Sequence, residues 1–203
     1  MLTVLTFTFL LAVPPAPPPH PATHVAAAPS ATIWKIDPVH SEINFRIRHL
    51  VGQVSGTFNV WSGTIVGTPP DWKDGKVDMQ IMVASIDTRI ARRDDHLRSA
   101  AFFDAERYPE IAFHSTKVVV NGNDLRIFGD LTLHGVTQPV VFAGKYWGET
   151  TTLAGRRVGF HAEGSIDRRK FGITWNQALE DGGVTLGEEV EIELNIEATP
   201  VQQ

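Results

Sequence analysis

Apolar and polar side chains alternate along most of the chain, beginning with residues 36–49. Ile43, Phe45 and Ile47 fall on one face of an extended segment, while the residues between them are polar. A period of two is typical of a β-strand that buries one face, so we predict a strand here. Residues 37–41, Asp-Pro-Val-His-Ser, predict a turn, because proline fixes φ and the Asp and Ser side chains can bond neighbouring backbone groups.

The same alternation predicts a series of further strands joined by short connections. The last strand has the clearest register, because a one-residue slip would bury four carboxylates. No helical period separates the strands up to residue 88, which indicates antiparallel neighbours rather than βαβ units. We also expect a loop over 68–75 and a hairpin turn at Asn121-Gly122. The predicted strands cover residues 54–60, 62–67, 77–88, 111–121, 125–133, 140–146, 158–166 and 189–198.

The alternation of apolar and polar residues is interrupted once, over residues 90–103, where good helix formers accompany the apolar Leu97 and Ala101. This segment predicts one short α-helix. About eight or nine strands with one helix are typical of a mainly β protein, either a sandwich or a closed antiparallel barrel. A barrel of roughly eight strands either fills with side chains or holds one small ligand.

Composition removes several classes of function. The net charge of −5 and a pI near 5.9 do not supply the extended basic surface that neutralises the phosphates of nucleic acid, so we expect no nucleic acid partner. The chain has no cysteine, which excludes disulfides, thiolate metal sites and a thiol nucleophile. His114, His134 and His161 lack the helical spacing of a zinc protease, and the sequence contains no Gly-x-Ser-x-Gly elbow or phosphate loop. We therefore expect neither a metal site nor an enzyme.

The first thirty or so residues differ from the rest of the chain. Leu2–Val13 is an apolar run too short to span a bilayer as a helix, but it has the length of a signal peptide core. Pro14–Pro21 follows as a spacer that cannot pack as helix or sheet. The first basic side chain other than histidine is Lys35, so a disordered tail is the alternative. We assign residues 1–31 to a signal peptide and Pro-rich disordered leader and residues 32–199 to one domain, and expect a periplasmic or secreted protein.

Several short motifs follow one another through the predicted domain. They are Trp34–Ser41 with Phe45 and His49; Gly56–Phe58; Arg93-Asp94 with His96–Ser99 and Phe102–Asp104; Tyr108-Pro109 with Phe113 and Ser115-Thr116; Gly129–Thr137; and Gly159-Phe160 with Arg169, Phe171 and Gly172. Each motif is weak alone. In this order and spacing, from about Trp34 to Ala198, the chain resembles the YceI-like polyisoprenoid-binding proteins.

The resemblance implies a lipocalin-like, eight-stranded antiparallel β-barrel with a hydrophobic pore, secreted to the bacterial periplasm. It implies an isoprenoid lipid or isoprenoid quinone as the bound ligand, with no other cofactor. Each CH₂ removed from water is worth about 0.8 kcal/mol, so a long prenyl tail needs a membrane or an apolar tube. Exchange between these two apolar media leaves a small free-energy difference, so we expect reversible binding, transient membrane contact and a carrier or storage role. The sequence does not distinguish a monomer from a homodimer.

The inward side chains of the predicted strands are the candidates to line this pore. Apolar alternation is equally typical of an ordinary packed core, so the assignment depends on the resemblance. His49 continues the inner face of the first strand, where it either bonds a ligand head group or is a buried histidine satisfied by a neighbour. The predicted ligand-binding residues are Phe45, Ile47, His49, Phe58, Met79, Ile81, Val83, Phe102, Phe103, Phe113, Leu131, Leu133, Phe160, Ile166 and Phe171.

The predicted helix carries a dense cluster of charges. One interpretation is a solvated helix face whose ion pairs each contribute under about 1 kcal/mol. The other is a lid over the pore, with Phe102 and Phe103 as a plug or as ligand contacts. The match to the family fits either interpretation, and we favour a structural role for Arg93, Asp94 and His96.

Two other functions fit parts of the pattern. A small outer-membrane barrel also alternates in twos, but its apolar side chains face lipid, and the glutamates of the last strand would then line a plugged lumen. A barrel enzyme acting on a lipid would need a reactive group near paired polar residues. Solubility separates the first alternative, because the domain without its leader should stay in solution without detergent only if its apolar faces point inward.

Overall fold

The computed structural model describes residues 31–179 and 183–201, so most of the predicted leader, residues 1–30, lies outside the described residues. Among the described helices, none combines the length and the apolar character needed to cross a membrane. The elements are β1 (Thr32–Ile36), β2 (Glu42–His49), β3 (Gly52–Phe58), β4 (Trp61–Thr68), β5 (Asp71–Met82), η1 (Val83–Ser85), β6 (Ile86–Asp87), α1 (Ala91–Arg98), β7 (Glu110–Asn121), β8 (Asp124–Leu133), β9 (Val136–Thr152), β10 (Gly155–Asp167), η2 (Arg168–Phe171), β11 (Ala178–Leu179), β12 (Gly183–Val184) and β13 (Leu186–Pro200).

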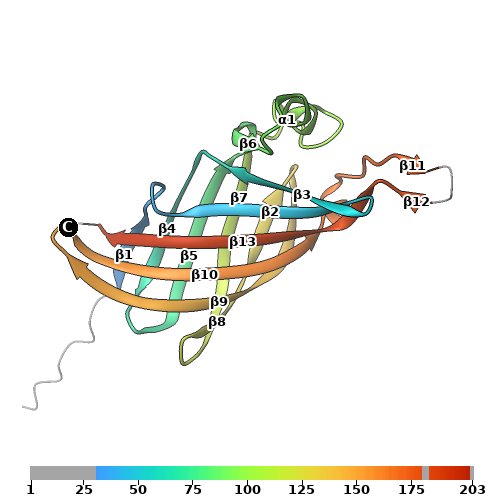
Figure 1. The fold of residues 1–203 in the computed structure, drawn as a ribbon. Helices are drawn as coiled ribbons and strands as arrows, with labels where there is room; N and C mark the ends of the chain where they lie inside the picture. The colour runs from blue at the N-terminus through green and yellow to red at the C-terminus, as the bar shows by residue number, and fades with distance from the viewer. Residues whose placement is uncertain (1–30, 180–182, 202–203) are drawn as a thin grey trace, which may run out of the picture.

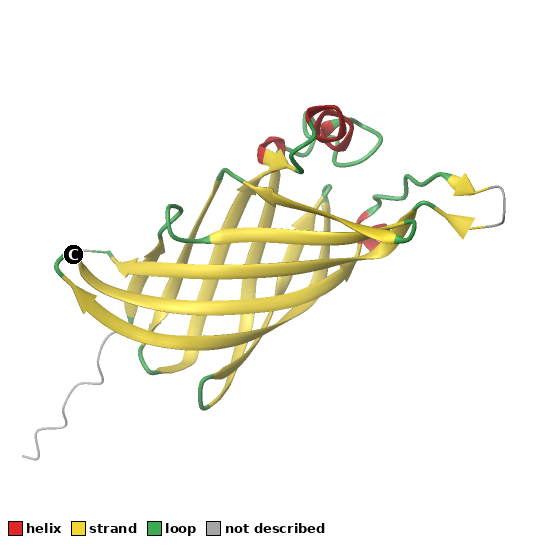
Figure 2. Ribbon diagram, viewed as in Figure 1, coloured by secondary structure: helices red, strands yellow, loops and turns green. Residues whose placement is uncertain are grey.

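Eight strands close into an antiparallel barrel, which confirms the predicted fold class (Figure 1). Their order around the barrel is β1, β4, β5, β7, β8, β9, β10 and β13, and pairing of β1 with β13 closes it. β2, β3 and β6 continue the sheet from β13. Strands dominate the described chain in Figure 2, with α1 lying beyond one edge of the barrel. The fold is therefore mainly β with one α-helix in the described ranges.

The predicted turn at residues 37–41 divides the edge of β13 between two strands. β1 pairs with the C-terminal end of β13, and β2 pairs with its N-terminal part. The side chain of Asp37 accepts the N–H of Val39 at 2.9 Å. The hydroxyl of Ser41 accepts the N–H of Glu197 at 2.9 Å and donates to its carbonyl oxygen at 3.2 Å. These bonds fix the point at which the chain leaves the closed barrel and begins the β2–β3 hairpin.

The prediction of a loop over residues 68–75 is wrong for most of this segment. β4 and β5 form a hairpin, and β5 already begins at Asp71. Trp72 provides the reason, since its side chain is 2% exposed and packs edge-on against Phe160 with 4.9 Å between ring centroids. Proline, aspartate and glycine predicted a loop from local preference, whereas burial of the indole holds this segment in the sheet.

Two other predicted elements are shorter in the structure. The strand predicted over 77–88 ends with β5, and the chain then forms η1 and β6. The helix predicted over 90–103 ends before Ser99, whose hydroxyl donates to the carbonyl oxygen of His96 at 2.7 Å. The chain then turns, and Phe102 is buried in these turns. A helix that continued to residue 103 would point this side chain in another direction.

Polar side chains of α1 fasten the helix to the edge of the barrel. The buried carboxylate of Asp94 accepts the hydroxyl and, at 2.9 Å, the N–H of Thr88. Arg93 donates to the hydroxyl and carbonyl oxygens of Thr88 at 2.7 and 2.8 Å. Arg98 donates to two carbonyl oxygens of the η1–β6 segment at 2.9 Å each. Charge-assisted bonds to buried partners are stronger than surface ion pairs, so these contacts favour the structural interpretation of Arg93 and Asp94.

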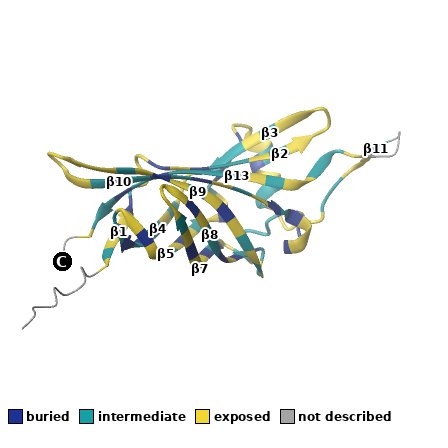
Figure 3. Ribbon diagram, turned by 90° about the horizontal axis from the view of Figure 1, so that it is seen from below, coloured by how far each residue is buried: buried dark blue, intermediate teal, exposed yellow. Residues whose placement is uncertain are grey.

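Aromatic rings fill one end of the barrel interior. This aromatic plug consists of Trp34, Trp72, Tyr146 and Phe160, with 6.3 Å between the centroids of Trp34 and Trp72 and 5.5 Å between those of Trp72 and Tyr146. The indole N–H of Trp34 donates to the carbonyl oxygen of Gly67 at 3.1 Å. Along the strands, buried and exposed positions alternate (Figure 3), as a barrel with one apolar interior requires.

Candidate functional site

A cavity of about 210 Å³ lies inside the barrel. The side chains that line it are apolar apart from Asn44, His161 and Arg168. The Asn44 amide donates to Glu42 at 3.2 Å, and His161 Nδ1 lies 3.0 Å from Asn195 Oδ1, so both have polar partners of their own. The interior therefore favours an apolar guest over a polar one.

Most of the predicted ligand-binding residues surround this cavity. They come from strands that are distant in sequence, which the closed barrel brings to one interior. Their contact with a ligand stays a prediction. The residues placed in the lining are Phe45, Ile47, Phe58, Met79, Ile81, Phe102, Phe103, Phe113, Leu131, Leu133, Phe160 and Ile166.

Three predicted residues, His49, Val83 and Phe171, are not among the residues that line this cavity, and their contact with a ligand stays a prediction. His49 is exposed at the end of β2, because the strand runs on into the hairpin beyond the enclosed interior. Val83 is buried in η1, where the chain has left the strand and its N–H donates to the carbonyl oxygen of Pro109 at 2.9 Å. Phe171 is buried in η2 rather than on a strand, so it packs in the core without facing the cavity.

Sequence reasoning left several lining residues out of the predicted set. The alternation of the last strand could have identified four of them, since Val190, Ile192, Leu194 and Ile196 all fall on its apolar face. Leu97 of α1 had no such signal, because only the packing of the helix against the barrel gives its direction. The others include Ile36, Ile43, Ile65, Trp72, Val77, Ile111, Val118, Leu125, Ile127, Phe142, Ala162 and Ile173.

Glycine makes room for one aromatic ring of the lining. A Cβ atom on Gly129 would lie 2.4 Å from the ring of Phe113 and 2.6 Å from the carbonyl oxygen of His114. The ring of Phe113 also packs edge-on against Phe142, with 5.5 Å between centroids. A side chain at position 129 would therefore push this ring out of its place, so the glycine helps to shape the cavity wall.

The segment after α1 covers one end of the cavity. Phe103 packs edge-on against Phe58, with 6.2 Å between ring centroids. Phe102 lies beside the rings of His96 and Trp175, at centroid distances of 5.0 and 4.9 Å. His96 also contacts Trp175 at 4.9 Å, so it takes part in this packing. The position of Phe102 and Phe103 agrees with the predicted cover over the barrel, while opening of such a lid stays a prediction.

Arg168 is a charged side chain at the cavity, and it is only 4% exposed. Its guanidinium donates to the carbonyl oxygens of Gly187, Ile173 and Trp175 at 2.8 to 2.9 Å. Burial lowers the pKa of Arg168, with a smaller contribution from the neighbouring charge of Arg169. Because Nε and Nη1 donate to these backbone carbonyls, Arg168 ties β13 to the segment after η2.

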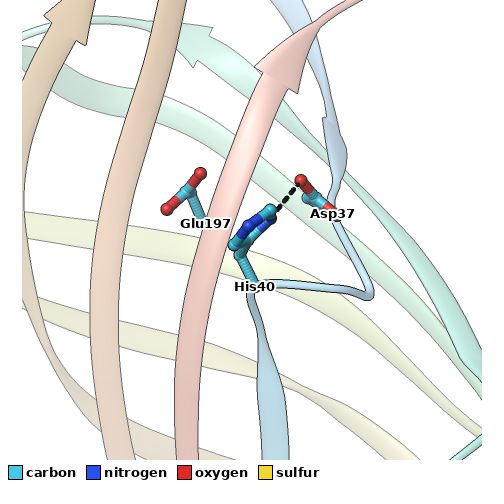
Figure 4. Close-up of side chains that lie close together, drawn as sticks. All are labelled: Asp37, His40 and Glu197. Atoms are coloured by element: carbon cyan, nitrogen blue, oxygen red, sulfur yellow. Dashed lines mark hydrogen bonds and ion pairs between the residues drawn. The ribbon is translucent and has the colours of Figure 1, made fainter.

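A separate polar cluster joins Asp37, His40 and Glu197 on the outside of the barrel (Figure 4). Their potential ligand atoms lie within 4.8 Å of one another. His40 Nδ1 lies 2.8 Å from Asp37 Oδ2, and Arg157 donates to both carboxylates. The hydrogen bond with His40 lowers the pKa of Asp37 to about 2, helped by the Val39 N–H and Arg157. The guanidinium already supplies the positive charge, so the cluster is an ion-pair network that fastens the 37–41 turn to β13 and β10.

The dependence of the free energy of unfolding on pH in the acid range tests this ion-pair network. Because the pKa of Asp37 falls from 3.8 to about 2 on folding, its carboxylate stabilises the fold above pH 3.8, and that contribution is lost as the pH falls towards 2. We expect Asp37→Asn to lower the free energy of unfolding at neutral pH and to flatten its dependence on pH between 3.8 and 2. Urea unfolding followed by tryptophan fluorescence measures both. Asp74→Asn, at an exposed carboxylate of β5, is the control, and an equal slope in wild type and Asp37→Asn would contradict the assignment.

Known proteins resemble this chain in both sequence and fold. The model of the YceI-like domain family matches residues 34–198. Protein YceI of Escherichia coli O17:K52:H18 is 42% identical over 152 residues, which make up 73% of this chain and 80% of that protein. The family match begins within β1 and ends within β13, so it includes at least part of every strand of the barrel.

Solved structures share the fold at lower sequence identity. BcnA of Burkholderia cenocepacia superposes with a TM-score of 0.72 at 22% identity, covering 81% of this chain and 99% of that chain. A polyisoprenoid binding domain from Saccharophagus degradans, described as implicated in plant cell wall breakdown, superposes with a TM-score of 0.63 at 16% identity. That match covers 83% of this chain and 98% of the other. At these identities the two structures show a common barrel fold.

Proposed function

Because the chain belongs to the YceI-like family, we propose that it binds the tail of a long isoprenoid lipid or isoprenoid quinone inside its barrel and carries or stores it in the periplasm. The cavity of about 210 Å³ with its apolar lining is the observation that carries this proposal. The polyisoprenoid-binding neighbour from Saccharophagus degradans, which has the same fold, supports the choice of ligand class.

The chemistry of the lining supports a tail rather than a head group as the bound part. A prenyl tail offers only carbon and hydrogen, so it needs no hydrogen-bond partner from the wall. Each buried CH₂ group adds about 0.8 kcal/mol relative to water. An apolar tube and a bilayer differ little in this respect, so the tail can be exchanged with a membrane at small net cost.

Access to the cavity is proposed at the α1 end. Half-buried side chains line the cavity there, among them Ile47 of β2, Leu97 of α1 and Phe103. The aromatic plug fills the other end, where Trp34 and Trp72 are buried. A lipid tail would therefore enter beneath α1 and point towards the plug.

The outward faces of the strands support a barrel surrounded by water. On β13 the exposed Glu191 lies 3.6 Å from Arg46 of β2, and Glu193 lies 3.6 Å from the same guanidinium. Charges at these positions would be costly against hydrocarbon. This arrangement favours the carrier over the outer-membrane barrel. The YceI-like barrel is a binding fold, and a role without catalysis is part of the proposal.

Extraction of the purified protein tests the proposed ligand. The full chain would be produced in a bacterium that makes isoprenoid quinones, purified without detergent and extracted with organic solvent. We expect mass spectrometry of the extract to show a prenyl lipid in near-stoichiometric amount. Fractionation of the same cells tests the periplasmic location. An extract that contains only membrane phospholipid, in the proportions of the host membrane, would contradict the proposed ligand.

A further inference from the structure

The turn between β2 and β3 exposes two apolar side chains, Leu50 and Val51. Leu50 is 42% exposed, and Val51 is 103% exposed. Leu50 also has a φ of +51°, a backbone conformation that favours glycine or asparagine at a hairpin turn. Neither burial nor turn preference therefore accounts for leucine and valine at these positions.

Backbone contacts hold this turn in a fixed position. The N–H of Leu50 donates to the carbonyl oxygen of Thr185 at 2.9 Å, and Arg48 donates to the carbonyl oxygen of Leu50 at 3.2 Å. Val184, which precedes Thr185, is 52% exposed. Leu50 and Val51 are here called the apolar tip, and the exposed Val184 directly precedes the residue whose carbonyl oxygen bonds this turn.

Strand β2 runs from the cavity to the apolar tip. Ile47 of β2 lines the cavity and pairs with Val190 of β13, another lining residue. Two residues further along β2, His49 is opposite the half-buried Leu186 and directly precedes Leu50. A lipid tail at the apolar tip would therefore reach the interior along the inner face of β2.

The charge beside the tip favours an anionic surface as the partner. Arg48 is exposed and forms no ion pair within the described ranges. Its guanidinium is placed at the tip by the bond to Leu50, next to His49. A cationic side chain beside exposed apolar groups is the pattern of a peripheral contact with anionic lipid head groups.

We propose that the apolar tip inserts into the surface of an anionic lipid bilayer and that isoprenoid lipid passes from there to the cavity; the second part rests on the proposed function. The opposite end of the molecule provides a comparison. Leu153 is 111% exposed, but the β9–β10 turn that carries it lies at the end of the molecule near β1 and the C-terminus, away from the β2–β3 turn (Figure 1). The small apolar area of the tip makes the contact reversible, as a carrier requires.

Vesicle binding tests the proposal. The full chain is mixed with vesicles of phosphatidylcholine and phosphatidylglycerol at roughly 3:1, which gives an anionic surface. Binding is measured by sedimentation of the vesicles. We expect Val51→Asp to weaken binding about tenfold or more, because it removes an apolar contact and adds repulsion. Leu153→Asp makes the same change in charge at the other end and should bind like wild type. Arg48→Gln should weaken binding to these vesicles but not to pure phosphatidylcholine.

The lipid content of each purified protein separates this proposal from the proposed function. Val51 is fully exposed and does not line the cavity, so Val51→Asp should unfold at the same temperature as wild type and keep the affinity of the cavity for lipid. Loss of the membrane contact should slow loading, while protein from prolonged expression should still carry lipid from the host. Equal vesicle binding by Val51→Asp and wild type would overturn the membrane contact and leave the proposed function standing. Weaker binding by Val51→Asp, together with a wild type that carries no prenyl lipid, would support the membrane contact and refute the proposed function.

Discussion

Ile81→Asp is expected to reduce the prenyl lipid recovered from the purified protein at least tenfold. Ile81 lies on β5 and lines the cavity, where it is half-buried. A carboxylate in an apolar interior costs several kcal/mol unless it is paired, and 1.4 kcal/mol already corresponds to a factor of ten in affinity. A lipid tail cannot supply the missing partner. Solvent extraction with mass spectrometry, normalised to protein, measures the effect.

The neighbouring position gives a matched control. Gln80 precedes Ile81 on the same strand and is exposed on the outer face, so Gln80→Asp introduces the same charge without reaching the cavity. It should retain lipid at the wild-type level. Phe113→Asp on β7 provides a second test from a different strand. If both cavity variants are soluble and folded by circular dichroism and still carry lipid, the assigned lining is refuted.

Arg168→Met is expected to lower the free energy of unfolding by about 3 kcal/mol or more. The guanidinium donates to three backbone carbonyl oxygens, those of Gly187, Ile173 and Trp175, and is almost fully buried. Methionine matches much of the volume but donates no hydrogen bond. Each lost bond to a charged group is worth about 1.5–3 kcal/mol, and buried carbonyl groups left without a partner add to the loss. Urea unfolding followed by tryptophan fluorescence measures the change.

The adjacent arginine provides the control for this experiment. Arg169 is exposed and makes ion pairs with Asp167 at 2.8 Å and with Glu188. Exposed pairs contribute about 0–1 kcal/mol, so Arg169→Met should cost under about 1 kcal/mol. Arg168→Met should also retain less lipid, because Ile173 lines the cavity and depends on the Arg168 contact for its position. Equal destabilisation by the two variants would show that the buried hydrogen bonds of Arg168 contribute no more to stability than the exposed ion pairs of Arg169.

Local sequence pattern was sufficient for the strands and for several turns. The alternation around Phe45 and along residues 189–198 predicted inner and outer faces that the structure has. The hairpin turn predicted at Asn121-Gly122 joins β7 and β8, one residue later than expected: Asn121 ends β7, and the turn residues are Gly122, with a φ of +60°, and Asn123. The side chain of Asp37 accepts the N–H of Val39 within the turn that its residue type predicted. These features follow from neighbours in sequence, so the sequence determined them by itself.

Only the tertiary structure decided which apolar side chains surround a void and which fill the core. The alternation of apolar and polar residues shows which side chains of a strand point inward. It does not give the distance across the barrel, which depends on how the closed sheet curves and how side chains from opposite walls meet. Phe113 and Phe171 look alike in the sequence, yet only Phe113 lines the cavity, because the chain leaves the barrel wall before Phe171. The same holds for Arg168, whose three backbone acceptors lie 5 to 19 residues away and meet it only in the folded chain.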